Sequence, residues 1–341
     1  MQVRDQRAIE LAKRADAAGF DALWLAGGGD NFIKAALMLN ATSRITVGTS
    51  IIGALLMSPI AHANIASYLQ EISGGRFILG FGSQTKGQLR ADLGYDIDHI
   101  AKRAKEVIEV TRGILSGRPF EYQGEFEQFT GNARRIRPGV APAPIYHSGV
   151  GPINLRYAGE VTDGFLAHPI FTRKYYEDVV WPRIDNGLRR AGKTRADFEM
   201  VAMPMTLIVN DESERPALIS AAKRNIAFYF TTRAYGDFQD FNGWKKQREA
   251  IWEVAARVGR VSSRFDYDAL EACVTDDMVD EVCLVGTAAE VRAKALKRYE
   301  GIADQLDFYP MHDGSHTREQ GQEHEYEQSL RFVEALQGLN R

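Results

Sequence analysis

The sequence predicts an α/β fold of repeated strand–helix units, best described as a (β/α)₈ barrel of parallel strands. Short apolar segments alternate with amphipathic ones, which is the pattern of a parallel sheet covered by helices. The segment 77–81 is too apolar for a strand with one exposed face, so it indicates a strand that is buried on both sides. The predicted strands lie at 22–26, 45–52, 77–82, 144–148, 163–167, 199–208 and 305–309.

Several of the predicted helices carry clear end signals. Ser58 followed by Pro59 offers an N-cap and a first-turn proline, and the pair Thr287 and Glu290 has the spacing of a capping box. Gly74 and Gly75 can adopt the left-handed conformation that ends a helix. The predicted helices lie near 5–18, 31–41, 59–72, 98–116, 152–159, 172–192, 211–228, 287–300 and 322–338.

The chain reads as one domain, residues 1–341, without repeats, low-complexity segments or a linker. Two segments, 117–143 and 229–265, are longer than ordinary connections in a barrel and are predicted to be insertions. Within the first, residues 120–126 are predicted to form a hairpin around Gly124. The second is rich in aromatic residues, which favours local core packing over a cover for a binding site.

The composition indicates a soluble enzyme domain. The chain has 341 residues, of which 45% are hydrophobic and 26% charged, with a formal net charge of −3, so nothing attracts it globally to nucleic acid. The two cysteines, Cys273 and Cys283, show neither metal-ligand nor disulfide spacing, and we expect no metal site. No apolar segment reaches the length of a membrane span, and we expect a cytoplasmic protein.

In a barrel, the chemistry lies at the carboxyl ends of the strands, so the residues directly after each strand are the candidates. Few of them are strong acids or bases, which favours a reaction whose difficult step belongs to a bound cofactor. Gly80 and Gly82 would allow a ligand to approach the backbone, although a tight turn without a ligand stays open as an alternative. The candidate segments are 27–30, 50–53, 83–85, 147–151 and 168.

The segment Ser148–Gly151, followed by Pro152, ends a strand and opens a helix. Free backbone N–H groups and the positive end of the helix would converge there, so an anion such as a phosphate could bind. From these residues alone, an empty turn remains an equal alternative.

A series of motifs follows the chain over nearly its whole length: 19–24, 42–49, 71–94, 103–115, 145–152, 158–164 and 299–304. With these motifs the sequence resembles the luciferase-like monooxygenase superfamily of flavin and deazaflavin oxidoreductases. The segments 80–84, 168–169 and 227–235 make it most similar to the subgroup that uses coenzyme F420. The resemblance implies a TIM barrel of the bacterial luciferase-like type, with coenzyme F420 as cofactor and FMN as the alternative.

The barrel that the resemblance implies has one strand more than the sequence offers. Three explanations are open: the first strand is a rudimentary stub at Met1–Arg4, the sequence lacks residues that similar proteins have, or the segment 282–285 enters the barrel. Our prediction is the stub.

The resemblance also assigns cofactor contacts. In similar proteins the loop that corresponds to Ser148, Gly149, Val150 and Gly151 holds the cofactor phosphate, with Gly82 and Ser83 nearby. The step from Ser50 to Ile51 matches a non-prolyl cis peptide that faces the cofactor ring. Nothing in these two residues demands it, so a trans strand end stays open.

Three residues are candidates for proton transfer. His168 follows a predicted strand and is matched by a histidine in the similar subgroup, and an imidazole titrates near neutrality. A histidine that bonds backbone groups at a strand end is the alternative. His147 competes for the role, although its place in a strand favours packing, and Asp30 also suits a helix N-cap.

The chain departs from the similar subgroup at the substrate side. An acidic residue expected after the strand 22–26 is replaced by the glycines 27–29, and an expected arginine is replaced by Met57. The substrate preferences of the subgroup therefore do not transfer.

We expect hydride transfer between coenzyme F420 and a small organic substrate, namely a carbonyl, an alcohol or an activated alkene. An FMN-dependent monooxygenase that uses reduced flavin and O₂ is one alternative, and a cofactor-poor, non-catalytic binding or assembly subunit is another. By resemblance we also expect a homodimer formed by the helices that flank the early strands, with His62 and Tyr68 near the contact, and no nucleic acid or membrane partner.

Overall fold

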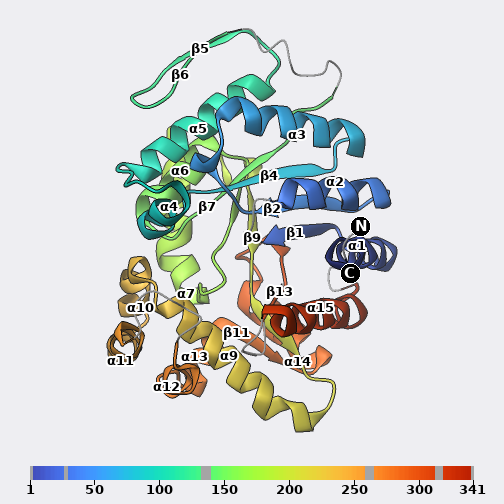
Figure 1. Ribbon diagram of the computed structural model, residues 1–341, viewed down its shortest axis with the longest axis vertical. Helices are drawn as coiled ribbons and strands as arrows, with labels where there is room; N and C mark the ends of the chain where they lie inside the picture. The colour runs from blue at the N-terminus through green and yellow to red at the C-terminus, as the bar shows by residue number, and fades with distance from the viewer. Residues whose placement is uncertain (1–2, 27–29, 132–139, 258–264, 312–317, 339–341) are drawn as a thin grey trace. The chain divides into compact units, whose positions relative to one another are not determined.

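The computed structural model describes residues 3–26, 30–131, 140–257, 265–311 and 318–338, in which strands and helices alternate along the chain (Figure 1). The chain falls into two compact units. Unit 1 comprises Met1–Ala167 and Trp181–Val201, and unit 2 comprises His168–Val180 and Ala202–Arg341. The single domain expected from the sequence stays a prediction, and each unit is described by itself.

The strands of unit 1 form a parallel sheet in the order β1-β2-β4-β7-β8-β9. Each neighbouring pair within it is parallel, which confirms the strand–helix alternation of the predicted fold class. A short strand, β3, pairs with the end of β4. The strands are β1 (Ala22–Ala26), β2 (Thr46–Ser50), β3 (Ile52–Gly53), β4 (Phe77–Gly82), β7 (Ile145–Ser148), β8 (Gly164–Leu166) and β9 (Glu199–Ala202).

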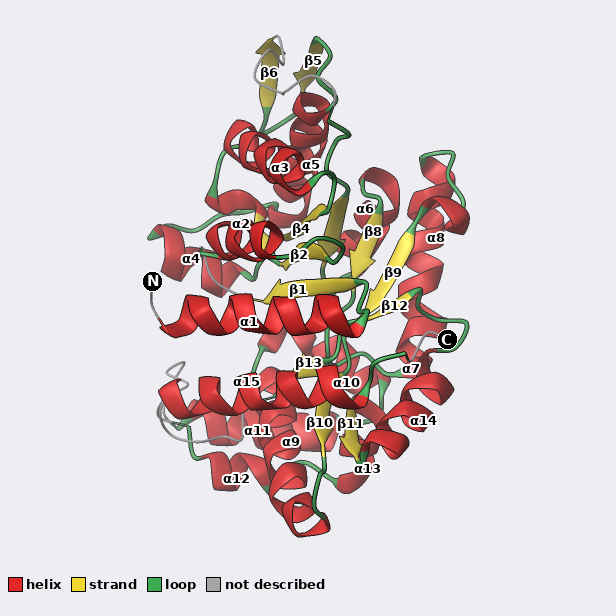
Figure 2. Ribbon diagram, turned by 90° about the vertical axis from the view of Figure 1, so that its right-hand side faces the viewer, coloured by secondary structure: helices red, strands yellow, loops and turns green. Residues whose placement is uncertain are grey.

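Helices connect these strands and cover the sheet, as Figure 2 shows for α2, α3 and α5 beside β2 and β4. The helical elements are α1 (Val3–Ala18), α2 (Asn31–Ala41), η1 (Ala54–Leu56), α3 (Pro59–Ser73), α4 (Lys86–Leu93), α5 (Ile100–Leu115), α6 (Pro152–Val161), α8 (Trp181–Arg190) and η3 (Arg195–Asp197).

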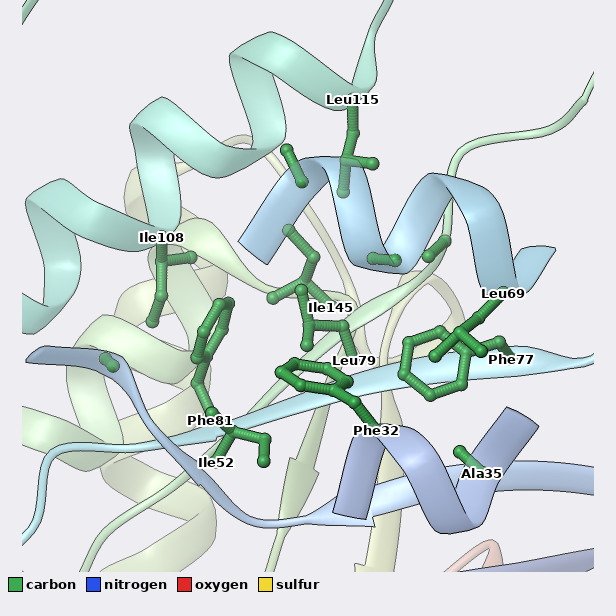
Figure 3. Packing of buried hydrophobic residues seen from close by; sticks show 14 of the residues in the cluster. Phe32, Ala35, Ile52, Leu69, Phe77, Leu79, Phe81, Ile108, Leu115 and Ile145 are labelled. Atoms are coloured by element: carbon green, nitrogen blue, oxygen red, sulfur yellow. The ribbon is translucent and has the colours of Figure 1, made fainter. Parts of the chain in front are cut away.

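The strand β4 is buried at every position, as its composition predicted. Phe77, Leu79 and Phe81 join the core that packs against the surrounding helices (Figure 3). Ile78 belongs instead to a second cluster with Tyr146, Leu166 and Val201. Because successive side chains of a strand point to opposite faces, β4 contributes to a separate core on each side of the sheet.

Unit 2 contains a three-stranded parallel sheet in the order β11-β10-β13. Its strands are β10 (Met205–Ile208), β11 (Cys283–Gly286) and β13 (Tyr309–Pro310), and the short β12 (Gln305–Leu306) precedes β13. Its helical elements are α7 (Arg173–Tyr175), η2 (Tyr176–Val180), η4 (Glu212–Glu214), α9 (Arg215–Phe230), η5 (Arg233–Tyr235), α10 (Gly236–Phe241), α11 (Lys245–Ala256), α12 (Tyr267–Glu271), α13 (Asp276–Val282), α14 (Ala288–Tyr299) and α15 (Arg318–Ala335).

The predicted local signals are confirmed where they depend on neighbouring residues alone. The Ser58 side chain accepts from the N–H of Ala61, and Thr287 and Glu290 form the capping box of α14. Gly74 ends α3 in the left-handed conformation. The hairpin pairs β5 (Phe120–Gln123) with β6 (Gln128–Gly131), and its turn begins at Gly124.

Two predictions about the strands are wrong. Val3 and Arg4 lie in α1 and not in a stub strand, while residues 1–2 lie outside the described residues. The predicted strand 199–208 is two strands in different sheets, separated at Pro204, which has no N–H to donate. The segment 282–285, an open alternative for the missing strand, contributes to β11, which pairs with β10 in the smaller sheet.

The predicted helix 172–192 is also interrupted. Its middle turn is the π-helix η2, which ends directly before Trp181 and Pro182. A proline inside a helix lacks an N–H, and its ring collides with the carbonyl group four residues before it. The wider π turn accommodates Pro182 where a regular α-helix would not.

His62 on α3 is fully buried, and the dimer contact expected near it stays a prediction. Its Nε2 lies 3.2 Å from the carbonyl oxygen of Ala54, and its ring packs edge-on against Phe81. Burial lowers the pKa of His62 from 6.5 to about 4, although the Ala54 and Met57 carbonyl groups oppose the shift. The folded chain therefore keeps this imidazole neutral.

The pH dependence of stability tests this state of His62. The unfolded chain takes up the proton near pH 6.5 and the folded chain only near pH 4, so stability falls as the pH drops through this window. One pKa unit corresponds to 1.36 kcal/mol, so His62→Gln should remove about 3 kcal/mol of the loss. Denaturant unfolding between pH 7 and 4 measures the difference, with the surface variant His99→Gln as control. Parallel curves for wild type and His62→Gln would show that His62 titrates normally.

Candidate cofactor-binding site

The carboxyl ends of β3, β4 and β7 lie side by side in unit 1. Gly82 at the end of β4 pairs with Gly53 on one side and with Ser148 on the other. The peptide bond between Ser50 and Ile51 is cis, as the resemblance implied, and it separates β2 from β3. The structure thus brings together the predicted residues at one edge of the sheet.

Two glycines at this edge are required by the chain itself. A Cβ atom on Gly80 would lie 1.9 Å from the carbonyl oxygen of Thr49, and one on Gly82 would lie 2.3 Å from Cδ1 of Ile51. The Thr49 hydroxyl also bonds both the N–H and the carbonyl oxygen of Gly80. The preceding segment of the chain therefore fills the space over Gly80 and Gly82, and the cofactor contact at Gly82 stays a prediction.

Asn154 on α6 connects the two neighbouring loops and was missed by the sequence reasoning. Its Nδ2 donates to the hydroxyl oxygen of Ser83 at 3.1 Å. A Cβ atom on Gly149 would lie 2.6 Å from Cβ of Asn154, so Gly149 must be a glycine for this side chain to fit. The only available signal was an amide side chain in the first turn of a helix that follows a glycine-rich loop.

The N-terminus of α6 is open. Gly151 occupies the N-cap position, has no side chain to accept from the helix, and a Cβ atom there would meet nothing within 4 Å. Pro152 brings no N–H, so the first N–H groups that can face a ligand are those of Ile153 and Asn154. Uncapped N–H groups and the positive helix end favour an anion at this position.

A buried polar atom at the same edge also lacks a partner. Ser50 is only 9% exposed, and within the described part of the chain its hydroxyl has no hydrogen-bond partner. A buried polar atom without a partner is costly, so this hydroxyl fits a polar ligand at this edge. Together with the open N-terminus of α6, it fits the phosphate-bearing cofactor that the resemblance implies.

His147 lies on β7 between Tyr146 and Ser148 and is only 2% exposed. Its neighbour Tyr146 faces the cluster with Trp24 and Leu166, so the imidazole points to the opposite side of the sheet. Burial lowers the pKa of His147 to about 4, and polar contacts with Asn154 and the Phe81 backbone only partly oppose this. The structure favours the packing role that the sequence had left open.

Asp30 occupies the N-cap position of α2, but its side chain makes no capping hydrogen bond. The carboxylate lies 3.0 Å from Nζ of Lys34 and is half exposed. The expected side-chain cap is therefore wrong, and the glycines 27–29 before it lie outside the described residues.

His168 begins unit 2, two residues after the end of β8. The edges of its ring meet Tyr229 at 5.1 Å and Tyr235 at 4.7 Å between ring centroids. Burial lowers its pKa to about 3, so the ring is neutral at pH 7 and does not titrate near neutrality as expected. Nδ1 accepts a long hydrogen bond of 3.4 Å from the N–H of Ile170, which leaves the proton of the neutral ring on Nε2.

The family described as luciferase-like monooxygenase matches residues 3–305. The chain belongs to this family. It is 30% identical over 311 residues to an uncharacterized protein of Mycobacterium tuberculosis, covering 87% of this chain and 89% of that protein. It is 28% identical over 295 residues to the 5,10-methylenetetrahydromethanopterin reductase of Archaeoglobus fulgidus, covering 85% and 86%.

Solved structures show the same fold. The coenzyme F420-dependent tetrahydromethanopterin reductase of Methanopyrus kandleri superposes with a TM-score of 0.76 at 22% identity, over 97% of this chain and 94% of that one. The oxygenating constituent of the 3,6-diketocamphane monooxygenase of Pseudomonas putida, in complex with FMN, gives 0.64 at 16% identity, over 99% and 94%. These likenesses confirm the predicted luciferase-like TIM barrel, and this member of the family is a luciferase-like oxidoreductase.

Within the described residues, no helix is long and apolar enough to cross a membrane. The same residues contain no group of three or more histidine, cysteine or acidic side chains that could hold a metal ion.

Proposed function

We propose that this protein transfers hydride between coenzyme F420 and a small organic substrate, namely a carbonyl, an alcohol or an activated alkene. The observation that carries the proposal is the open N-terminus of α6 beside the ends of β4 and β7. The family match and the sequence similarity to a reductase support a redox reaction. A further relative from Mycobacterium tuberculosis, 27% identical over 303 residues, is described as a putative coenzyme F420-dependent oxidoreductase.

The chain would hold the phosphate of the cofactor by backbone groups. The N–H groups of Ile153 and Asn154 would donate to it, and the hydroxyl of Ser83, which Asn154 orients, would add a further contact. Ser50 and Ile51 would face the ring system, with the Ser50 hydroxyl available to a polar ring atom. When bound, coenzyme F420 supplies the carbon that carries the hydride.

His168 is the proposed partner of the substrate oxygen. Because its ring is neutral at pH 7 with the proton on Nε2, it can donate a hydrogen bond there without adding a charge. In the oxidative direction, the same N–H would orient the oxygen of an alcohol. Because the lowered pKa makes His168 a weak base, its role would be to orient the substrate oxygen and to hydrogen bond to the negative charge that develops on it.

Two alternatives keep specific support. The family name and the FMN-bound structural neighbour favour an FMN-dependent monooxygenase that consumes O₂. Met57, which replaces an expected arginine, favours a binding subunit without catalysis. Binding of FMN alone would support the first alternative, and binding of neither cofactor would support the second.

Substitutions at Gly151 test the phosphate site. Gly151→Asp should weaken coenzyme F420 binding at least 100-fold, because it puts a carboxylate where the phosphate approaches the N-terminus of α6. Since the position has open space and ordinary backbone angles, an aspartate N-cap should leave the fold intact or stabilise it. Fluorescence titration gives the dissociation constants, and thermal melting without cofactor reports on the fold.

Gly151→Ser is the matched control for this experiment. It supplies an N-cap oxygen of similar size without charge, so its binding should fall far less than that of Gly151→Asp. A wild-type dissociation constant for Gly151→Asp would move the phosphate to another part of the chain.

The role of His168 is tested by single-turnover hydride transfer, followed through the deazaflavin absorbance. His168→Gln should slow this step by roughly 10²–10⁴-fold while cofactor affinity changes little. The surface variant His99→Gln should keep the wild-type rate. Equal rates for His168→Gln and wild type would eliminate the assignment and leave Asp30 or His147 as candidates. A joint loss of stability and cofactor affinity would instead identify a structural histidine.

We also propose a homodimer formed through α2, η1 and α3. Four large apolar side chains are exposed on these elements, namely Ile33, Leu56, Tyr68 and Ile72. Sedimentation at micromolar concentration should give twice the chain mass, and the double variant Tyr68→Glu with Ile72→Glu should give the monomer. A monomeric wild type would remove this proposal.

A further inference from the structure

Unit 2 contains a group of polar aromatic side chains around His168, which we call the tyrosine cluster: Tyr229, Tyr235 and Tyr309. Tyr229 comes from α9, Tyr235 from η5 and Tyr309 from β13. The rings of Tyr229 and Tyr235 each contact the His168 ring. The Tyr229 hydroxyl donates to the Tyr309 hydroxyl over 3.3 Å. All these side chains keep part of their surface accessible to solvent.

The backbone fixes the direction of the Tyr309 side chain. The N–H groups of Asp307 and Tyr309 donate to the carbonyl oxygens of Ala202 and Pro204, as in a parallel ladder. Asp307 and Tyr309 therefore share one face, while Phe308 between them packs against Phe332 of α15. The two backbone hydrogen bonds thus hold the Tyr309 side chain on the face opposite to the one on which Phe308 contacts Phe332.

Tyr309 accepts the hydrogen bond from Tyr229 through a lone pair of its hydroxyl oxygen. The proton of the Tyr309 hydroxyl is therefore still available to donate. Among the residues that the structure describes, no acceptor takes this proton. A hydroxyl that is held in place by one bond and still has a proton to donate is a donor prepared for an external oxygen.

The charges around the cluster decide which oxygen it suits. Burial raises the pKa of Tyr229 and of Tyr309, and the negative charge of Glu325 raises both further. Burial also raises the pKa of Asp307 to about 7. Burial also raises the pKa of Tyr235 to about 12. No lysine or arginine of the described chain offsets these shifts. The three tyrosines are therefore uncharged at pH 7, and an anionic ligand would lose its hydration there with no cation to balance its charge.

We propose that the Tyr309 hydroxyl, which Tyr229 connects to His168, is a substrate-binding donor that receives the oxygen of an uncharged carbonyl or alcohol, with aromatic rings nearby that favour an aromatic or apolar substituent. This inference rests on the proposed function, for which it names the substrate class. It excludes phosphorylated substrates and carboxylates as preferred ligands. The aromatic-rich insertion thereby has a binding role at Tyr229 and Tyr235, while Phe230, Phe238 and Trp244 pack on one another as local core.

Two probes that share one carbonyl group test this proposal: acetophenone, which is neutral, and 4-acetylbenzoate, which adds a carboxylate. Equilibrium dialysis measures their binding to the full chain, with and without oxidised coenzyme F420. We expect acetophenone to bind at least 10-fold more tightly than 4-acetylbenzoate. Tyr309→Phe keeps the ring and removes the donor, so it should weaken acetophenone binding by about 3- to 10-fold, the range of one neutral hydrogen bond. Tyr176→Phe, which removes a buried hydroxyl elsewhere in unit 2, should bind acetophenone as wild type does.

The outcomes separate this inference from the proposed function. A wild-type chain that binds acetophenone no better than 4-acetylbenzoate overturns it, and this comparison needs no variant. A Tyr309→Phe variant with wild-type affinity for acetophenone overturns it as well. Coenzyme F420 titration of Tyr309→Phe should give the wild-type dissociation constant. Absence of coenzyme F420 binding in wild type would count against the proposed function, whereas dialysis without cofactor would still test Tyr309.

Discussion

The close approach of Thr49 to Gly80 is the constraint on which the arrangement of unit 1 depends. The Thr49 hydroxyl bonds the N–H and the carbonyl oxygen of Gly80, at a distance that leaves no space for a Cβ atom. Two residues further along both segments, the Ile51 side chain occupies the space where a Cβ atom of residue 82 would lie. The main chain of Thr49, together with Leu166, fills the corresponding space over Gly80. This contact sets Ser50, Ile51 and Gly82 at the same edge of the sheet, where Ser148 is paired in register.

The start of α6 is the second feature that shapes this edge of the sheet. Its position follows from β7, which brings Ser148 beside Gly82, and from Gly149, whose missing side chain lets Asn154 reach Ser83. The helix therefore begins beside the strand ends with an uncapped N-terminus. Glycine at 151 removes the oxygen that would ordinarily satisfy these N–H groups, which leaves them to a ligand. The same loop, Ser148–Gly151, must therefore leave space both for the Asn154 side chain and for a bound anion.

The sequence predicted those features that depend on near neighbours. The caps at Ser58 and Thr287 and the hairpin at Gly124 rest on residues within a few positions of one another, and they are confirmed. The division of 199–208 into two strands was not predicted, because it depends on which sheet each half joins. The same holds for β11, whose apolar composition suits either sheet. The alternation of strands and helices indicated a barrel, whereas the luciferase-like type of barrel and the cis peptide came from the resemblance.

The candidate site could be predicted in position but not in electrostatics. Ser50, Gly82, Ser83 and Ser148 were expected at one edge because parallel strands end together. The packing of Thr49 and Ile51 over Gly80 and Gly82 was not predicted, because it joins residues that are distant in sequence. Asn154 and Tyr309 were missed because an amide in a helix and a tyrosine in a strand carry no distinctive signal. The neutral states of His147 and His168 follow from burial, which comes from residues distant in sequence.

The central claim is that this edge of unit 1 binds coenzyme F420. Isothermal titration calorimetry of the purified wild-type chain, with oxidised coenzyme F420 and with FMN in separate experiments, tests it most directly. The account predicts one site per chain for coenzyme F420, with an affinity at least 10-fold higher than that for FMN. A chain that binds FMN more tightly, or that binds neither molecule, would contradict it.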